Sequence, residues 1–173
     1  FLTTLFPASQ LHILDYNRVV KDLNALSKEE FLNRVAEYFI IEPQNKAFAP
    51  QQLHDMGMFL DGSWYKLSAR PGTFTEDPIG VLDVTILQDN LLDMVLDIKD
   101  RRTDTRIYFV GGIRGLVELE KRVNSGEMKV AFSLYPVSIQ QLFDIADSGM
   151  VMPPKSTWFE PKLRDGLLTH LID

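Results

Sequence analysis

The chain has 173 residues, 45% of them hydrophobic and 24% charged, so it is long enough to bury a full core and has the composition of a globular protein. Its 18 basic and 24 acidic residues give a net charge of -6, which supplies no general attraction for a polyanionic backbone and argues against nucleic acid as a partner. The absence of cysteine excludes disulfides, thiolate metal sites and a cysteine nucleophile, and it favours a cytoplasmic location. No apolar run approaches the roughly 20 residues of a membrane span, so no membrane partner is expected.

The beginning of the chain indicates that it is part of a longer protein. Phe1 is not an initiator methionine, and the run FLTTLFP has no basic stretch ahead of an apolar one, as a signal peptide would have. The run is β-prone and has no polar lead-in, as if the chain entered a strand already under way. We therefore expect residues 1–173 to form a single domain, the C-terminal fragment of a protein whose N-terminal half is missing.

The predicted elements combine hairpins with alternating strands and helices. Strands are predicted at residues 2–6, 11–15, 39–42, 57–60, 63–69, 106–110 and 130–135, and a β-rich stretch ends the chain. Helices are predicted at residues 28–38, 83–96, 116–123 and 139–146. This order predicts an α+β fold with a mixed, largely antiparallel sheet and several helices packed on it.

Helix-capping residues support three of the helix boundaries. Ser27 and Glu30 form a capping box that is predicted to begin the first helix, and Ser138 and Gln141 form another before the last. Asp83 is predicted to cap the second helix with its carboxylate. Each cap is worth about 1 kcal/mol, which is enough to fix where a helix begins.

Turn residues divide the remaining elements. The pair Asp61-Gly62 between two β-prone runs is a strong signal for a two-residue hairpin turn. Gly126 and Gly149 stand just past two predicted helices, where a C-cap glycine is expected. Two prolines bracket the polar run at residues 43–50, which is therefore predicted to be a loop.

The most unusual polar cluster lies in the C-terminal segment VMPPKSTWFEPKLRDG. Lys155, Ser156, Thr157 and Lys162 stand there among three prolines and two aromatic residues. Prolines stiffen a backbone, and ammonium and hydroxyl groups donate hydrogen bonds, so the segment could hold a phosphate or a carboxylate. In the alternative, the segment enters a strand, its lysines are solvated and its aromatic residues belong to the core.

The same region contains a near match to the phosphate-binding loop motif G-x-x-x-x-G-K-[ST]. Residues 149–156 fit the pattern except at Pro154, which stands where the second glycine must supply a backbone N–H and permissive dihedral angles. The true motif leads from a strand into a helix, whereas this stretch leaves a predicted helix and enters a predicted strand. We therefore reject it as a nucleotide-binding loop.

A second candidate site is the glycine-rich stretch VGGIRG at residues 110–115, between a predicted strand and a predicted helix. Free backbone amides at a helix N-terminus can bind an anion, and Arg114 would add positive charge. The stretch lacks the first glycine of the dinucleotide-binding fingerprint, because Val110 stands there. A tight strand-to-helix turn is the simpler explanation of the glycines.

A third candidate is the polar group Asp15, Asn17 and Arg18 in LDYNRVV, at the end of an apolar predicted strand. Polar side chains at a strand terminus could face a ligand. The alternative is an ordinary turn with an exposed arginine.

The sequence predicts no metal site and leaves the cofactor open. Eight carboxylates and three basic residues stand between residues 76 and 104, and Asp89, Asp93 and Asp97 follow one another at a helical spacing of four. Three aspartates on one rigid helix face rarely converge on one ion, so we expect a solvated face there rather than a magnesium site. The three histidines do not have the spacing of metal ligands, and the nucleophile motif of serine hydrolases is absent.

Five blocks of the sequence resemble one family in their order along the chain. LHILDYNRVV, GMFLDGSWYKL, LDVTILQDNLL, RIYFVGGIRGLVELEKRV and MPPKSTWFEPKLRDGL are similar to consecutive blocks of the uncharacterised family known as domain of unknown function 1015. Members of that family carry an upstream Asp-Gly-His-His-Arg motif similar to one in ParB-like and free-serine-kinase-like proteins, and this chain lacks it. Members often have histidine where this chain has Asn17, so the resemblance implies no catalytic role for Asn17.

The resemblance implies that the C-terminal polar cluster faces a nucleotide-handling, phosphotransferase-like half of the protein. Our first hypothesis is that the chain is the anion- or phosphate-binding part of a small-molecule enzyme, such as a kinase or phosphotransferase. Its partner would be an anionic small molecule or a nucleotide. The candidate anion-binding residues are Lys155, Ser156, Thr157, Lys162, Arg18 and Arg114.

The second hypothesis is a non-catalytic interaction or dimerisation domain. In it, Trp158, Phe159 and Phe132 would pack against a second copy or against the missing half of the protein, because a severed domain exposes the surface that it once buried.

Overall fold

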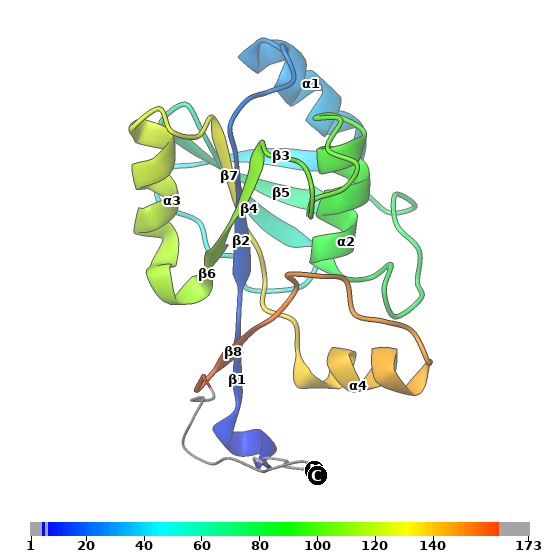
Figure 1. Ribbon diagram of the computed structural model, residues 1–173. Coiled ribbons are helices and arrows are strands. Elements are labelled where there is room, and N and C mark those ends of the chain that lie inside the picture. The colour runs from blue at the N-terminus through cyan, green and yellow to red at the C-terminus, as the bar shows by residue number, and fades with distance from the viewer. Residues whose placement is uncertain (1–4, 6, 163–173) are drawn as a thin grey trace.

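A six-stranded sheet forms the centre of the molecule, with helices on both of its faces (Figure 1). The structure, a computed structural model, describes Leu5 and residues 7–162. The strands are β1 (His12–Leu14), β2 (Tyr16–Val20), β3 (Phe39–Gln44), β4 (Asp55–Leu60), β5 (Ser63–Ala69), β6 (Ile107–Gly111), β7 (Val130–Ser133) and β8 (Trp158–Glu160). The helices are α1 (Lys28–Tyr38), α2 (Asp83–Leu87), α3 (Gly115–Asn124) and α4 (Ile139–Asp147), with the helical turns η1 (Ala8–Gln10), η2 (Gln88–Asp93) and η3 (Gly112–Arg114). The predicted α+β class is confirmed, and the sheet, predicted to be mixed and largely antiparallel, is antiparallel at every described pair.

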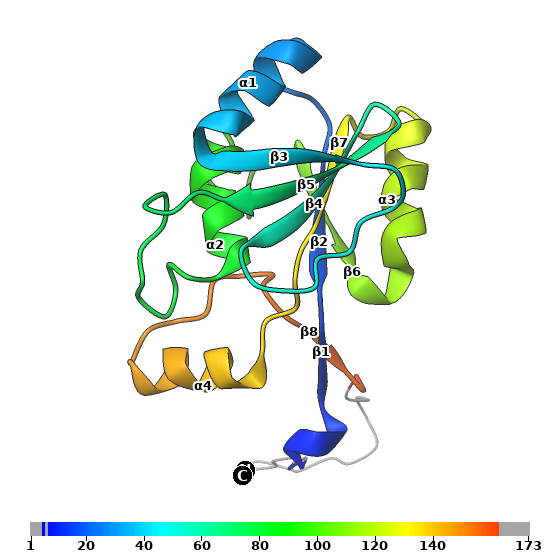
Figure 2. The same cartoon turned by 180° about the vertical axis from the view of Figure 1, so that it is seen from behind.

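The strand order places β2 inside the sheet. The order is β3-β5-β4-β7-β2-β6, and every pair described in this sheet is antiparallel. Arg18 in β2 therefore stands opposite Phe109 on one side and Phe132 on the other. Figure 2 shows β3, β5 and β4 turned relative to β2, as the twist of a sheet requires. β1 and β8 form a separate two-stranded ladder, in which Ile13 stands opposite Phe159.

The larger core lies on the face of the sheet that α1, α2 and η2 cover. Val20, Met58 and Phe132 point to this face and are completely buried. They belong to one apolar cluster with Phe31 of α1 and Leu87 of α2. Each such side chain stabilises the fold by about 1.5–3 kcal/mol relative to leaving it in water.

The smaller core lies on the opposite face, beneath α3. Val19, Phe59 and Ala131 point there and belong to one cluster with Leu119 of α3. Successive residues of a strand point to opposite faces, so Val19 and its neighbour Val20 enter different cores. The molecule therefore has three layers, with the sheet in the middle.

The predicted capping boxes are confirmed. The Ser27 hydroxyl accepts a hydrogen bond from the Glu30 N–H at 3.2 Å, and the Ser27 N–H donates to the Glu30 carboxylate at 2.9 Å. Ser138 and Gln141 make the corresponding pair at the start of α4. Local chemistry thus sets both helix starts before tertiary packing acts.

The predicted hairpin is confirmed as well. Leu60 of β4 stands directly opposite Ser63 of β5, so Asp61 and Gly62 alone make the turn. Their φ angles are 50° and 75°, both in the left-handed region that this type of turn requires.

The second predicted helix is wrong in two details. Leu82, not Asp83, is the N-cap residue, and the Asp83 carboxylate is buried at the start of α2 instead of capping it. The helix changes to a π-helical turn in η2, which ends at Asp93. Asp97 has a φ angle of 53° and lies outside the helix, so the expected ladder of three aspartates on one helix face does not form.

The N-terminal strand predictions are partly correct. The predicted strand at residues 11–15 corresponds to β1, but β2, which starts directly after it, was not predicted. Of the predicted strand at residues 2–6, positions 2–4 and 6 lie outside the described residues. None of the helices in the described part of the chain has the length and apolar character that crossing a membrane requires.

Candidate anion-binding site

Arg18 is the most unusual charged residue in the described part of the chain, because it is completely buried. It lies in the middle of β2 and shares its face of the sheet with Val20, so its side chain points toward the layer of α2 and η2. The prediction of a turn with an exposed arginine at this position is wrong, because Arg18 lies buried within a strand. Val19 and Val20 continue the apolar run beyond Arg18, and this continuation is the signal that could have identified an interior strand.

The Arg18 guanidinium has far fewer partners than it has donors. Its Nη2 donates one hydrogen bond of 2.8 Å to the backbone carbonyl of Lys155. Its Nε and Nη1 are buried and have no hydrogen-bond partner among the described residues. The guanidinium carbon lies 5.2 Å from the ring centre of Phe109 and 5.9 Å from that of Tyr16, within range of cation–π attraction. These rings orient the cation but supply no counter-charge.

Burial lowers the pKa of Arg18 to about 9, and the nearby positive charge of Arg101 acts in the same direction. The side chain nevertheless remains charged at neutral pH. Arg101 itself is partly buried, and its pKa is lowered by the same desolvation while the Asp89 carboxylate opposes this. The positive charges of Arg18 and Arg101 thus repel each other. Arg18 forms no ion pair among the described residues.

The segment that covers Arg18 is the one that sequence analysis singled out. Lys155 contributes its backbone carbonyl to Arg18 and has a φ angle of 58°, which is unfavourable for a residue with a side chain. Its own side chain lies in an exposed position. The Ser156 hydroxyl is buried and donates a 2.6 Å hydrogen bond to the carbonyl of Pro153, and Thr157 is partly buried. The structure therefore brings the backbone of Lys155 to Arg18 but not its side chain, and the Ser156 hydroxyl bonds within its own segment.

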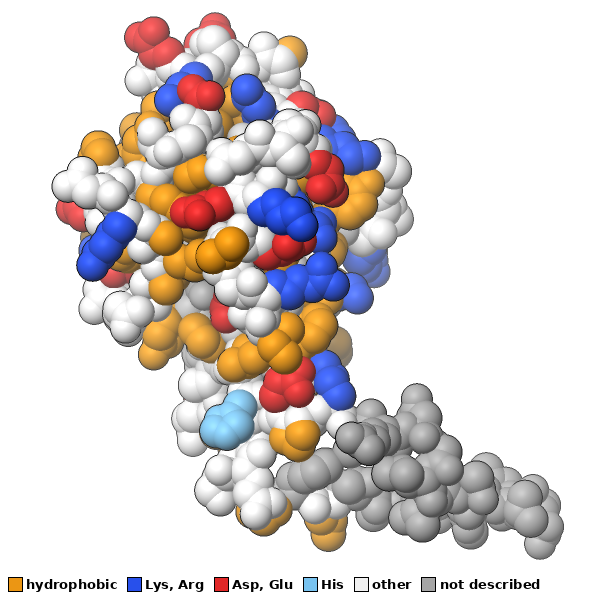
Figure 3. Space-filling model, turned by 90° about the vertical axis from the view of Figure 1, so that its left-hand side faces the viewer, with side chains coloured by type: hydrophobic (Ala, Val, Ile, Leu, Met, Phe, Trp, Pro, Cys, Tyr) orange, Lys and Arg blue, Asp and Glu red, His pale blue; other side chains and the backbone are white. Residues whose placement is uncertain are grey.

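The other two candidate residues lie apart from Arg18. The ammonium of Lys162 lies 4.3 Å from the centre of the Trp158 ring. Arg114 forms an ion pair of 3.7 Å with Glu118 of α3, on the opposite side of the sheet. Figure 3, which looks onto that side, shows acidic, basic and exposed hydrophobic side chains interspersed.

The glycine-rich stretch has a packing explanation. A Cβ on Gly111 would lie 2.5 Å from the Trp158 ring, and a Cβ on Gly112 would lie 2.0 Å from Oδ1 of Asp15. Only glycine permits both approaches. The turn into η3 and α3 therefore needs these glycines whether or not an anion binds there.

Sequence analysis missed one buried ionisable group, Asp83. Its Oδ1 accepts a 2.8 Å hydrogen bond from the backbone N–H of His54, and its Oδ2 is buried without a partner among the described residues. Burial raises its pKa to about 7, and the negative charge of Asp55 adds to this. No group of three or more acidic or histidine side chains in the described part of the chain is arranged to hold a metal ion.

Solved structures of other proteins have the same fold at low sequence identity. Two mutants of a free serine kinase, each in complex with AMP, match with TM-scores of 0.52 and 0.51 at 13% and 15% identity. A conserved hypothetical protein from Pyrococcus furiosus matches with a TM-score of 0.51 at 15% identity. Each match covers 87% of this chain but only 54%, 55% and 56% of the respective structures. The chain thus spans about half the length of the structures that it resembles.

The sequence comparisons give one family. A search of curated proteins found no match. Residues 1–85, just under half of the chain, match the family described as protein of unknown function (DUF1015).

Proposed function

We propose that this chain is the anion-binding part of a small-molecule phosphotransferase, and that Arg18 is the centre of its phosphate site. The observation that carries the proposal is a completely buried guanidinium with two unpartnered nitrogens and no carboxylate paired with it among the described residues. A buried charge without a counter-charge is strongly unfavourable, and fixed dipoles or an ion must offset it. A phosphate or carboxylate supplies both the negative charge and the acceptors that Nε and Nη1 lack.

The geometry of a guanidinium favours a phosphate at this position. Nε and one Nη donate in parallel, which matches two oxygens of one phosphate group. In this protein the parallel pair is Nε with Nη2, as in the ion pair of Arg102 with Asp100. Nη2 of Arg18 is held by the Lys155 carbonyl, so a bidentate phosphate would take Nε together with Nη2 once Lys155 has moved away. The positive charge of Arg101 would strengthen the attraction.

Access to Arg18 requires residues 153–157 to move, because they cover it. One hydrogen bond from Arg18 holds this segment at Lys155, whose backbone adopts a strained left-handed conformation. Strain of this kind costs on the order of 1–3 kcal/mol and is found at switch regions and ligand clamps. In the proposed bound state the segment shifts and the Lys155 ammonium turns toward the anion. The hydroxyls of Ser156 and Thr157 then donate hydrogen bonds to the remaining oxygens of the anion. The roles of Lys162 and Arg114 remain predictions from sequence.

The comparisons support a nucleotide as the source of the phosphate. The free serine kinase structures with this fold contain AMP. In a phosphotransferase, cationic groups at the phosphate offset the charge that develops as the phosphoryl group moves between donor and acceptor. Arg18 would supply part of that charge, and residues outside this chain would complete the reaction.

Calorimetric titration with inorganic phosphate and with AMP tests the proposal. We expect both to bind the wild type, and we expect Arg18→Met to weaken binding at least tenfold. Arg102→Met is the matched control, because Arg102 is exposed and pairs with Asp100 at the surface. Equal affinity in the wild type and in Arg18→Met would refute the proposal, as would a loss of affinity as large in Arg102→Met.

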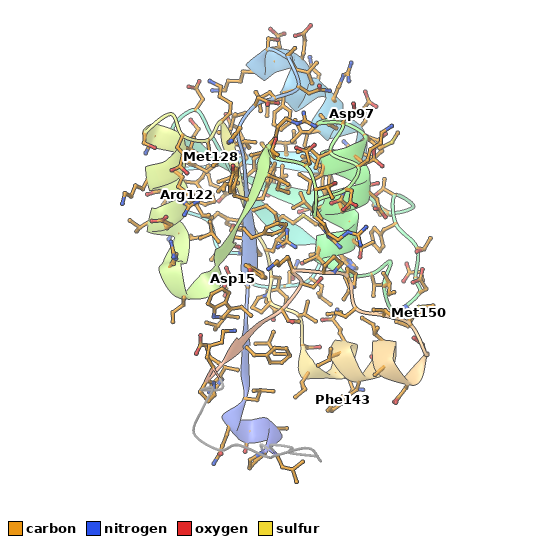
Figure 4. The ribbon with its side chains drawn as sticks, viewed as in Figure 1. Asp15, Asp97, Arg122, Met128, Phe143 and Met150 are labelled. Atoms are coloured by element: carbon orange, nitrogen blue, oxygen red, sulfur yellow. The ribbon has the colours of Figure 1, made fainter. Side chains whose placement is uncertain are left out.

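A specific observation also favours the second hypothesis, an interaction domain. Phe143, Met150 and Val151 are exposed at and beyond α4, and Figure 4 shows Phe143 on the side of α4 away from the sheet. Phe132, which sequence analysis assigned to such a surface, is completely buried in the core, and that assignment is wrong. Light scattering on the chain tests this alternative. A dimer that Phe143→Ser dissociates would support it, and a monomer at high concentration would reject self-association.

A further inference from the structure

A cavity lies on the opposite side of the sheet from the Arg18 side chain. It has a volume of about 270 Å³ and lies where β2 begins and β7 ends, near the start of α3. Asp15, Gly112, Gly115, Leu116, Leu134 and Pro136 line it. Figure 4 shows Asp15 at the junction of β1 and β2, near the start of α3. A dry cavity of about 150 Å³ already accommodates a benzene molecule, so this one has room for a small organic ligand.

The carboxylate of Asp15 is held in a fixed orientation. It accepts a hydrogen bond from Nδ2 of Asn17, and its Oδ1 lies against the backbone of Gly112. Asn17 is completely buried, and its own Oδ1 accepts a 3.0 Å hydrogen bond from the Leu134 N–H. Both the carboxylate and the amide that holds it are therefore positioned by the sheet and not by a loose surface loop.

This carboxylate has no positive partner in the described part of the chain. No lysine or arginine forms an ion pair with it there, although Arg114 lies in the turn that contains Gly112 and pairs with Glu118 instead. Burial raises the pKa of Asp15, against the opposing effect of the hydrogen bond from Asn17. A cation placed beside Asp15 would offset the desolvation that disfavours the charged carboxylate.

The rest of the cavity selects the kind of cation. Leucine, proline and glycine residues make up most of the wall beside Asp15, so they offer contact to an apolar body and few further ligands for a metal ion. The negative charge of Asp15 disfavours an anion. A ligand that fits has one ammonium group and a short apolar chain.

We propose that the cavity at Asp15 is a binding site for a small primary amine, with the ammonium group on the Asp15 carboxylate and the carbon chain against Leu116, Leu134 and Pro136. This site is separate from the phosphate site, because Asp15 and Asn17 point to one face of the sheet and Arg18 to the other. The proposal therefore does not depend on the function of Arg18.

Titration with n-butylamine, followed by calorimetry or by NMR shifts of the glycine amides at 111, 112 and 115, tests the inference. We expect n-butylamine to bind the wild type and 1-butanol, which has the same shape and no charge, to bind at least tenfold more weakly. Asp15→Asn keeps an oxygen that can accept from Asn17, so we expect the variant to fold and to lose at least tenfold in amine affinity.

Two further variants separate the site from the rest of the molecule. Ala49→Leu narrows the cavity without changing any charge, because Ala49 lines it from an exposed position, and it should weaken n-butylamine binding. Asp147→Asn removes an exposed carboxylate of α4 and should leave amine binding unchanged. Equal amine affinity in the wild type and in folded Asp15→Asn overturns the proposal, and so does equal affinity for 1-butanol or no binding of the amine at all.

Discussion

Asp83 and Arg18 are both buried without an ionic partner, but they differ in how each can lose its charge. Burial raises the pKa of Asp83 to about 7, so a proton can neutralise this carboxyl near neutral pH. Burial lowers the pKa of Arg18 only to about 9, so the guanidinium keeps its charge under the same conditions. A proton from water is therefore sufficient for Asp83, whereas Arg18 keeps its charge, which a bound anion offsets in the proposed function. This difference is why we propose the anion site at Arg18 and not a cation site at Asp83.

A third residue shows what a structural arginine in this protein looks like. Arg106 donates to the carbonyls of Leu96 and Asp97 at 3.0 Å each and pairs with Asp104 at 2.9 Å. It also lies 3.5 Å from Asp22. The pKa of Arg106 is raised by these partners, mainly by the hydrogen bond to Asp104. All three guanidinium nitrogens of Arg106 thus have hydrogen-bond partners, whereas only Nη2 of Arg18 has one.

The largest effect is expected at Asp83 and depends on pH. Because its folded-state pKa is raised, Asp83 contributes stability that is fully present below its unfolded-state pKa near 3.8 and is lost as pH rises through about 7. A shift of this size corresponds to roughly 4 kcal/mol at most. Asp83→Asn stays neutral at every pH, so its free energy of unfolding should increase relative to the wild type between pH 4 and pH 8. Urea denaturation at several pH values measures this difference.

Asp100 provides a control, because its pKa is shifted in the opposite direction from that of Asp83. The hydrogen bond from Arg102 lowers the pKa of Asp100 to about 2, so its contribution is present above pH 4 and is lost as pH falls toward 2. Asp100→Asn should therefore differ from the wild type mainly in the pH window above 4. A constant difference between the wild type and Asp83→Asn from pH 4 to pH 8 would show that Asp83 is not buried as the structure has it.

The second prediction concerns Arg106. Arg106→Met removes hydrogen bonds to two carbonyls and an ion pair, and we expect it to lower the free energy of unfolding by about 3 kcal/mol. Arg102→Met should change it by less than about 1 kcal/mol, because that ion pair is exposed. Chemical denaturation compares the two. Similar losses in both variants would contradict the idea that the hydrogen bonding of Arg106 is what stabilises the fold.

The third prediction is that replacing Arg18, unlike replacing Arg106, increases the free energy of unfolding. Replacing a buried, poorly paired charge with an apolar side chain of similar length is often stabilising. We expect Arg18→Met to raise the free energy of unfolding by about 1–2 kcal/mol in the absence of phosphate. A saturating phosphate concentration should then reduce the difference in free energy of unfolding between Arg18→Met and the wild type, since phosphate stabilises only the wild type. A loss of several kcal/mol in Arg18→Met would mean that Arg18 is a structural residue like Arg106.

The sequence predicted the elements whose signals are local. The capping boxes at Ser27 and Ser138 and the turn at Asp61-Gly62 involve residues within three positions of one another, and all three are confirmed. Helix α1 has the predicted bounds. Asp83 also carries a local cap signal, but the carboxylate bonds to the His54 N–H, which lies 29 positions away in the sequence. A tertiary contact overrode the local preference.

The site could be predicted only in part for the same reason. Lys155 and Arg18 are both candidates from sequence, but their contact joins residues 137 positions apart. The burial of Arg18 depends on pairing with β6 and β7 and on contact with the segment that contains Lys155. None of these partners lies near Arg18 in the sequence. The polar composition of both segments was visible from sequence, whereas their meeting was not.

The smallest effect is expected at Lys162, and it tests how far the covering segment moves. Its ammonium lies over Trp158, an exposed cation–π contact worth about 0.5 kcal/mol, so Lys162→Ala should hardly change stability. If only residues 153–157 shift on binding, Lys155→Ala should weaken phosphate binding severalfold and Lys162→Ala should not. Phosphate titration of the two variants separates these cases. A comparable loss in both would mean that β8 moves with the segment and that the two lysines chosen from the sequence act on one anion.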